Sequence, residues 1–361
     1  MKFLLYPLMI IFSIGIRLRH LLYDMGLLKS KSFDVPILCV GNLRVGGTGK
    51  TPMVDFLVKH LEGEYNIAVL SRGYKRKSKG FKILKDNSTT SEVGDEPLLQ
   101  KLLNPNIMVA VCESRCKGVK EILRENPEIN LIILDDAMQH RAINPKSTIL
   151  LTEYGNLYTF DKLMPIGTLR DLKERAKKAD IVVITKCPEK VKPIDLRLAM
   201  RDLSLKPYQQ LLFTKIKTQE PCSLFDNTPL VEADKVMITT AIGMPEKFID
   251  EVKRNYKVED IHIFRDHHNY SSTDIKTIFE QNEDKDCLHW DTPLLCTAKD
   301  AVKIKELNLG EDITRRIYVV NISLEVIDYP QALNEINFIN TVKNKLYGEY
   351  RRNRKSHKPK N

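Results

Sequence analysis

The 361-residue chain contains 42% hydrophobic residues, enough apolar material for two packed domains rather than one. Its net charge of +10 favours an anionic partner, such as a nucleotide or an acidic membrane surface. Only 7% of the residues are aromatic and no segment interleaves them with basic residues, which argues against a nucleic-acid-binding groove.

The N-terminal region carries a 14-residue segment without charged side chains, from Phe3 to Ile16, which is followed by Arg17 and Arg19. This segment is shorter than the roughly 20 residues that cross a bilayer, and no signal-peptide cleavage site follows it. We expect residues 1–30 to form a helix in the membrane interface, with its apolar side in lipid and the two arginines at the headgroups. A helix that packs on its own domain is the alternative.

A glycine-rich loop comes next. The apolar run Val35 to Val40 predicts a buried strand, and a helical spacing of apolar residues begins at Thr51. Between them the chain follows the pattern G-x-x-x-x-G-K-[ST], except that Arg44 stands at the first glycine position. In such a loop, backbone N–H groups and the lysine bind phosphate oxygens, and the hydroxyl binds Mg²⁺. The sequence therefore predicts that a nucleoside triphosphate binds to Gly46, Gly47, Thr48, Gly49, Lys50 and Thr51.

Two acidic residues, Asp135 and Asp136, follow another strongly apolar strand at Asn130 to Leu134. In P-loop enzymes an aspartate at the end of such a strand holds Mg²⁺ and its water shell. Further apolar strands alternate with helical segments as far as Thr185. This alternation predicts an α/β fold of the P-loop NTPase type, with a mainly parallel sheet, helices on both faces, and ligands at the carboxyl ends of the strands.

Proline and polar residues cluster between Thr218 and Asp234, and we place a domain junction there. A second, smaller α/β domain is expected beyond it, with a strand over Ile317 to Ile322. The last eleven residues include six Lys or Arg, which is typical of a basic tail suited to anionic lipid. The expected segments are a membrane-associated helix (1–30), a P-loop core domain (31–217), the smaller domain (218–330), and a C-terminal helix with the basic tail (331–361).

Phosphoryl transfer also requires a group that receives the proton of the acceptor. The candidates are Asp95, Glu96 and the cluster Asp266-His267-His268. A carboxylate that is hydrogen-bonded to a histidine can accept a proton near neutral pH. From spacing alone, a histidine near an acid is more often a structural hydrogen-bond partner, so the pair Asp95–His267 stays open at this point.

Seven short motifs occur in series along the chain: VGNLRVGGTGKTP (40–52), LSRGY (70–74), VGDEP (93–97), DDAMQHR (135–141), GTLR (167–170), FRDHH (264–268) and TAKDAVK (297–303). Together they resemble the tetraacyldisaccharide 4′-kinase family, the lipid A 4′-kinases. Each motif is weak alone, but the series covers most of the chain, from the N-terminal helix to about residue 303, and is specific as a whole.

The resemblance implies ATP- and Mg²⁺-dependent phosphorylation of the 4′-hydroxyl of an acylated glucosamine disaccharide 1-phosphate. This reaction belongs to lipid A (lipopolysaccharide) biosynthesis, at the cytoplasmic face of the inner membrane. With Lys50 on the phosphates and Thr51, Asp135 and Asp136 at Mg²⁺, the resemblance implies that Asp95 acts as the base together with His267. It also carries roles in metal, phosphate or substrate binding to Arg72, Tyr74, Glu96, Arg115, His140 and Arg170. An anionic membrane surface is expected as a partner, whereas nucleic acid and a protein partner are not.

Four positions depart from the family pattern: Ala137-Met138 where Gly-Phe is common, Asp171 where Glu is frequent, and Arg265 where Pro is frequent. None of them removes a group that phosphoryl transfer requires. The alternative function is a membrane-associated ATPase switch of the ParA/MinD type, whose loop resembles this one. That loop carries a lysine directly before its two glycines, where this chain has Val45. The missing lysine and the added Asp-His-His cluster count against the switch.

Overall fold

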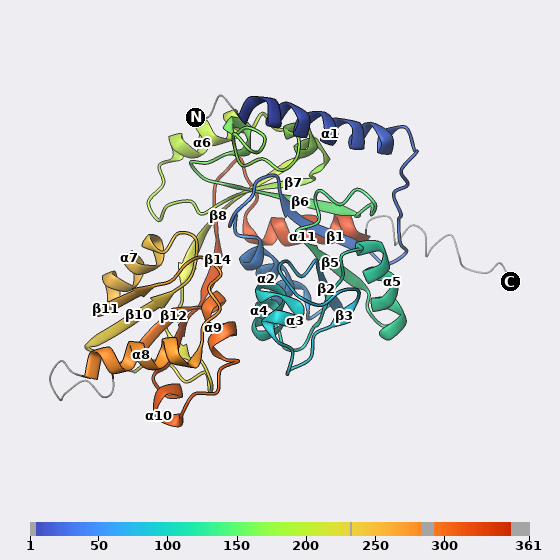
Figure 1. The fold of residues 1–361 in the computed structure, drawn as a ribbon. Coiled ribbons are helices and arrows are strands. Elements are labelled where there is room, and N and C mark those ends of the chain that lie inside the picture. Colours follow the sequence, from blue (N-terminus) through green and yellow to red (C-terminus); the bar gives the residue numbers. More distant parts are fainter. Residues whose placement is uncertain (1–4, 232, 284–291, 348–361) are drawn as a thin grey trace.

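The computed structural model describes residues 5–231, 233–283 and 292–347. Within these ranges the chain forms a large and a small sheet, each with helices packed against it (Figure 1). The predicted fold class is confirmed: an α/β protein with a mainly parallel P-loop-type sheet and a second, smaller α/β unit. The predicted basic tail at residues 351–361 lies outside the described residues.

The large sheet has nine strands in the order β14-β8-β7-β6-β1-β5-β2-β4-β3. They are β1 (Ile37–Asn42), β2 (Ile67–Ser71), β3 (Lys82–Ile83), β4 (Met108–Val111), β5 (Leu131–Asp135), β6 (Ser147–Glu153), β7 (Ile181–Thr185), β8 (Gln210–Thr218) and β14 (Ile322–Ile327). Neighbouring strands are parallel except at the two edges, where β14 and β3 are antiparallel to their neighbours. The carboxyl ends of the central strands therefore lie along one edge of the sheet.

The small sheet has five strands in the order β11-β10-β12-β13-β9, and all pairs are parallel except β13–β9. Its strands are β9 (Cys222–Ser223), β10 (Lys235–Thr240), β11 (Lys257–Ile263), β12 (Leu294–Thr297) and β13 (Ile317–Val320). The α-helices of the described chain are α1 (Tyr6–Asp24), α2 (Lys50–Leu61), α3 (Thr90–Val93), α4 (Asp95–Leu103), α5 (Arg115–Glu125), α6 (Pro193–Leu203), α7 (Glu246–Asn255), α8 (Ser272–Glu283), α9 (Ala298–Ile304), α10 (Glu311–Thr314) and α11 (Glu335–Tyr347).

Helices cover both faces of the large sheet, because alternate residues of its strands point to opposite sides. In β1, Leu38 and Val40 join a core cluster that includes residues of α2, α4 and α11. Ile37 and Cys39 join the cluster on the other face, with residues of α5 and α6. Both faces are buried, which accounts for the continuous apolar runs by which these strands are recognised in the sequence.

The chain returns from the small sheet to the large one at Asn321. The sequence predicted a single strand over residues 317–322, and this prediction is wrong. Strand β13 ends at Val320, and β14 then pairs antiparallel with β8 of the large sheet. Leu324 of β14 packs in the core cluster of the large sheet, whereas Ile317 of β13 packs in a core of the small sheet. An apolar run alone does not tell which of two cores buries it.

Helix α1 lies along the outer side of the molecule, across the upper part of Figure 1. It contains residues 6–16 of the apolar segment recognised in the sequence and extends as far as Asp24. Within the described part of the chain, no helix combines the length and the hydropathy that a membrane crossing requires.

Candidate active site

The glycine-rich loop joins the carboxyl end of β1 to the first turn of α2. Gly46 has a φ of +111° and Gly49 a φ of +85°, which are conformations that residues with side chains rarely adopt. Two hydrogen bonds from the carboxyl ends of β1 and β7 also fix Thr48 of the loop. The Asn42 amide donates to Thr48 Oγ1 (2.6 Å), and the Thr185 hydroxyl at the end of β7 donates to the Thr48 carbonyl (2.9 Å). The N-terminal amides of α2 and the helix dipole therefore complete a preformed anion site.

Arg44 occupies the position at which the general loop pattern has glycine. Its backbone does not have a positive φ, so the position does not require glycine. Its Nε donates to Thr168 Oγ1 (2.8 Å) and lies 3.0 Å from Asp161 Oδ2, while the Val45 N–H donates to the Thr168 carbonyl (2.8 Å). Arg44 thus fastens the outer side of the loop to the segment that contains the GTLR motif.

Three side chains from separate motifs meet beside this loop: Lys50, Asp136 and Arg170. The Arg170 guanidinium donates to both carboxylate oxygens of Asp136, with NH1 2.8 Å from Oδ2, and also to Asn42 Oδ1. Lys50 Nζ lies 4.0 Å from Asp136 Oδ2. Burial acts to raise the pKa of Asp136, but Lys50 and Arg170 outweigh it and leave the pKa below its usual value. Asp136 is therefore an anion held between two cations.

Asp135, the last residue of β5, is 1% exposed. Its Oδ1 is buried and has no hydrogen-bond partner among the residues that the structure describes. Burial, and then the negative charges of Glu96 and Asp136, raise the pKa of Asp135. A bound cation would satisfy such an oxygen. The described residues contain no cluster of three or more His, Cys, Asp or Glu that could hold a metal.

Asp95 begins α4 directly after Gly94, whose φ is +92° and whose missing Cβ would lie 2.9 Å from the Tyr74 carbonyl oxygen. Two groups from the small-sheet side reach the same carboxylate oxygen: His267 Nδ1 lies 3.0 Å and Lys303 Nζ 3.4 Å from Asp95 Oδ2. Burial acts to raise the pKa of Asp95, but the hydrogen bond from His267 and the charge of Lys303 leave it below its usual value. Asp95 is thus an oriented carboxylate between the two sheets.

Contacts of α4 connect this carboxylate to the glycine-rich loop. Gln100 is fully buried, and its Nε2 donates to the Thr51 carbonyl in α2 (2.9 Å). Glu96 in the first turn of α4 pairs with Lys299 of α9, with Nζ 3.2 Å from Oε1. Because the charge of Glu96 also raises the pKa of Asp135, the first turn of α4 and the end of β5 belong to one electrostatic site.

The other residues selected from the sequence lie around these groups. The Tyr74 ring meets the His267 ring edge-on, with centroids 6.5 Å apart, and Tyr74 is largely exposed. Arg115 is buried, and its NH1 donates to the Cys112 carbonyl (3.0 Å). Burial, and then the charge of Arg115, lowers the pKa of His140 to about 4. The side chain of Arg72, in contrast, is exposed.

Sequence reasoning missed four groups of the site: Asn42, Gln100, Thr185 and Lys303. Lys303 had an available signal, because it ends the TAKDAVK motif, but the motif does not tell which of its two lysines reaches Asp95. Asn42 lies within the loop motif and had no assigned role. Gln100 lies inside helix α4 and Thr185 at the end of strand β7, and neither belongs to a motif. Only the packing shows that both form hydrogen bonds with the loop.

A parallel sheet with a glycine-rich loop after β1 and an aspartate pair at the end of β5 defines a P-loop nucleotide-binding protein. A family model described as tetraacyldisaccharide-1-P 4′-kinase matches residues 1–339, and the chain belongs to this family. The curated tetraacyldisaccharide 4′-kinase of Bacteroides thetaiotaomicron is 38% identical over 342 residues, which cover 91% of this chain and 90% of that protein. The corresponding protein of Porphyromonas gingivalis is 36% identical over 329 residues, with coverages of 90% and 92%.

The fold is also similar to a solved structure of the family. The crystal structure of "apo" LpxK from Aquifex aeolicus in complex with ATP has a TM-score of 0.76 and 26% sequence identity. The similarity covers 96% of this chain and 99% of that one.

Proposed function

We propose that this protein is an ATP-dependent kinase that phosphorylates the 4′-hydroxyl of a tetraacyldisaccharide 1-phosphate in lipid A biosynthesis. Family membership supports the activity and the substrate. The observation that carries the proposal within this chain is the Asp95 carboxylate, which His267 and Lys303 orient beside a P-loop helix. An ATPase switch needs no such base for an acceptor, so the geometry favours the kinase over the ParA/MinD-type alternative.

The loop residues Gly46, Gly47, Thr48 and Gly49 and the side chain of Lys50 hold the β- and γ-phosphates of ATP in this proposal. Thr51, Asp135 and Asp136 would hold Mg²⁺, and the unpartnered Oδ1 of Asp135 fits that role. When bound, the ion neutralises charge on the phosphate oxygens. Arg170 keeps Asp136 oriented toward Lys50. Arg72, Tyr74, Glu96, Arg115 and His140 are proposed to contact the substrate or its phosphates.

Asp95 is proposed as the base. The O–H bond of the sugar 4′-hydroxyl breaks and its proton passes to the Asp95 carboxylate. The sugar oxygen forms a bond to the γ-phosphorus, the bond from that phosphorus to the bridging oxygen breaks, and ADP leaves with that electron pair. His267 and Lys303 occupy Oδ2, which orients the carboxylate for the transfer. A positioned base contributes a factor of about 10²–10⁴ to the rate.

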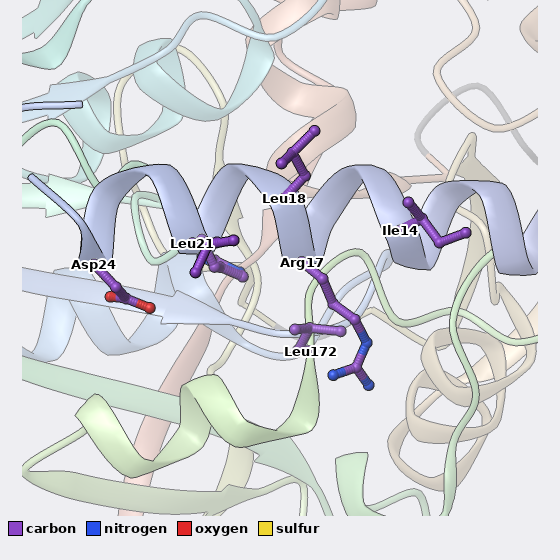
Figure 2. A pocket seen from close by; sticks show the side chains of 7 residues that line it. Ile14, Arg17, Leu18, Leu21, Asp24 and Leu172 are labelled. Carbon is purple, nitrogen blue, oxygen red and sulfur yellow. The ribbon is translucent and has the colours of Figure 1, made fainter. Parts of the chain in front are cut away.

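Helix α1 is proposed to lie in the membrane interface at the cytoplasmic face of the inner membrane. Its apolar residues Leu8, Ile10, Ile11, Ile14, Leu18 and Leu21 are each between 52% and 67% exposed. An open groove of about 480 Å³ runs beside the helix (Figure 2). It is lined by the apolar side chains of Ile14, Leu18, Leu21 and Leu172 and by the polar residues Arg17, His20 and Asp24. Exposed apolar side chains next to a cation suit an anionic membrane surface and an acylated substrate.

The four segments 1–30, 31–217, 218–330 and 331–361 are proposed as the functional units, with β14 of the third segment contributed to the large sheet. Contact between α4 and α9, which brings Lys303 and Lys299 to the acids of the VGDEP motif, supports a site that needs both sheets.

The proposal is tested with purified full-length protein in detergent, ATP, Mg²⁺ and a tetraacyldisaccharide 1-phosphate. We expect ADP formation that depends on the lipid and that falls by about 10²–10⁴ in Asp95→Asn and at least as much in Lys50→Ala. ATP hydrolysis that ignores the lipid, and that survives Asp95→Asn but not Lys50→Ala, would instead support the ATPase switch.

A further inference from the structure

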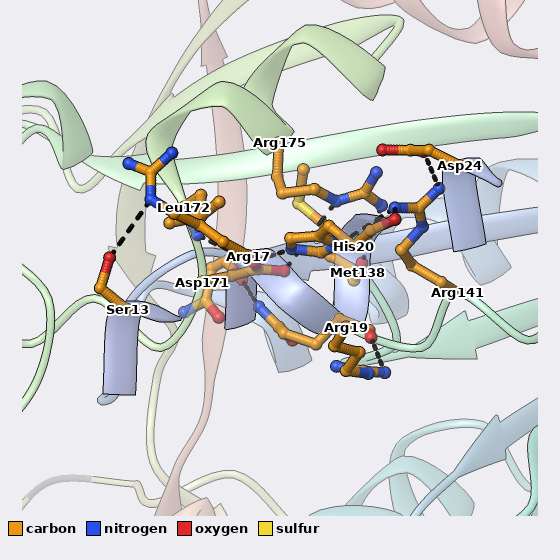
Figure 3. A network of polar contacts seen from close by, with 12 residues as sticks. Ser13, Arg17, Arg19, His20, Asp24, Met138, Arg141, Asp171, Leu172 and Arg175 are labelled. Atoms are coloured by element: carbon orange, nitrogen blue, oxygen red, sulfur yellow. Dashed lines mark hydrogen bonds and ion pairs between the residues drawn. The ribbon is translucent and has the colours of Figure 1, made fainter. Parts of the chain in front are cut away.

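The inward side of α1 carries a polar network that the membrane-anchor role leaves unexplained (Figure 3). His20 is buried, and its Nε2 lies 2.7 Å from Asp171 Oδ1. The Arg141 guanidinium donates from NH1 to His20 Nδ1 (3.1 Å) and from NH2 to Asp24 Oδ1 (2.6 Å). Since a guanidinium can only donate, Nδ1 accepts, and the Nε2–H is the group donated to Asp171. The network therefore fixes the hydrogen-bonding role of both ring nitrogens of His20, with Nδ1 as acceptor and Nε2 as donor.

The residues that α1 binds are directly connected to the phosphate site. Asp171 follows Arg170, the residue that holds Asp136 beside Lys50. Arg19 of α1 donates from NH2 to the Gln139 carbonyl (2.8 Å). Gln139 in turn donates from Nε2 to the Asn42 carbonyl at the end of β1 (2.6 Å). Two short paths thus lead from the inward side of α1 to the groups around the P-loop.

The Asp171 carboxylate has little freedom to move, because it is almost completely buried, at 2% exposed. Its Oδ1 accepts from His20 and from the Leu172 N–H (2.8 Å), and its Oδ2 lies 3.9 Å from Arg175 Nε. A buried carboxylate that loses a donor must move toward water or find another partner. Any such movement acts on the neighbouring residue, Arg170, and hence on its contact with Asp136.

We propose that His20 and Asp171 are positioning residues, through which the docking of α1 on the core sets the affinity of the P-loop for nucleotide. The outward side of the helix binds the membrane, while the inward side holds Arg170 and Asp136 in place. The inference rests on the proposed function only for the binding of nucleotide at the Lys50 loop. Thermodynamic linkage then requires that nucleotide binding raises the equilibrium constant for α1 docking by the same factor by which docking raises the affinity for nucleotide.

The test is the affinity of the full-length protein for ADP, measured by calorimetry in non-ionic detergent with Mg²⁺ and without lipid substrate. We expect His20→Ala and Arg19→Met to weaken ADP binding by roughly fivefold or more, which is the low end of coupling between sites. His20→Gln, which retains a donor near Asp171, should restore most of the affinity. Arg19 is an exposed residue, so its variant tests the proposal even where His20→Ala fails to fold.

Arg17→Met is the matched control on the same helix. Its guanidinium donates to Ser13 Oγ of α1 itself (3.4 Å), so this variant should bind ADP as the wild type does. In steady-state assays, His20→Ala and Arg19→Met should raise KM for ATP and leave KM for the lipid unchanged, a split that loss of folded protein does not produce.

Wild-type ADP affinity in folded His20→Ala and Arg19→Met would overturn the inference. So would an equal loss in Arg17→Met. Failure of the proposed function is a separate outcome, because it would appear as absence of phosphorylated lipid in the wild type while ADP binding and its dependence on His20 persist.

Discussion

Replacement of Lys303 by methionine removes the positive charge next to the Asp95 carboxylate and keeps an unbranched side chain of similar length. Lys303 is 6% exposed, and its Nζ lies 3.4 Å from Asp95 Oδ2 and 3.1 Å from the His268 carbonyl. Methionine can provide neither contact. Because misplacement of a reacting group by about 1 Å can cost 10²-fold in rate, we expect kcat to fall by roughly 10–100-fold, less than in Asp95→Asn.

The same variant has a predicted effect on the pH profile. Burial acts to raise the pKa of Asp95, but the hydrogen bond from His267 and then the charge of Lys303 leave it below its usual value, while Glu96 beside it is paired with Lys299. The base must be ionised to accept a proton, so activity is lost as the pH falls through the pKa of Asp95. Without Lys303 that pKa rises, and the acid limb of the profile should move to higher pH.

The assay is the initial rate of lipid phosphorylation at saturating ATP, followed as a function of pH. Lys299→Met is the matched control, because the same substitution on the same helix affects the pairing with Glu96 instead of Asp95. We expect it to leave the acid limb in place. A Lys303→Met enzyme with kcat within twofold of the wild type and an unshifted acid limb would refute the assigned geometry of the base.

Three further variants probe other parts of the account. Arg170→Met should raise KM for ATP by roughly tenfold, since Asp136 loses its two-pronged partner, and a Michaelis plot with unchanged KM would contradict this. Gln100→Leu removes the side-chain donor to the Thr51 carbonyl and should destabilise the protein by about 0.5–1.5 kcal/mol in urea unfolding, whereas an unchanged midpoint would argue against the contact. Ile11→Glu should weaken co-sedimentation with anionic vesicles without changing ADP affinity, and vesicle binding equal to wild type would exclude this face of α1 as the membrane contact.

The parts of the site that could be predicted from the sequence are those whose residues are neighbours in the chain. The strand before the loop, the loop glycines and Lys50 act through local backbone geometry, and a motif of a few residues contains all of it. The same holds for Asp135 and Asp136, whose position follows from the apolar strand that they end. The alternation of such strands with helices was likewise sufficient for the fold class.

Contacts between distant segments were out of reach for the residue pattern alone. The bond between Asp95 and His267 joins residues 172 positions apart, and it depends on how the small sheet sits against α4. The bond between His20 and Asp171 spans 151 positions. Arg44 is an example: the general loop pattern has glycine at this position. The role of the arginine depends on Thr168 and Asp161, which belong to a segment that the loop pattern does not include.

The most direct test of the central claim is the position of the phosphate in the product. The full-length enzyme is incubated with ATP, Mg²⁺ and tetraacyldisaccharide 1-phosphate, and the lipid is analysed by two-dimensional ³¹P–¹H NMR. We predict a second phosphorus signal that correlates with the proton on carbon 4′, and its absence when Asp95→Asn replaces the wild type. A lipid that keeps only its 1-phosphate while ATP is consumed, or a phosphate on another hydroxyl, would contradict the account.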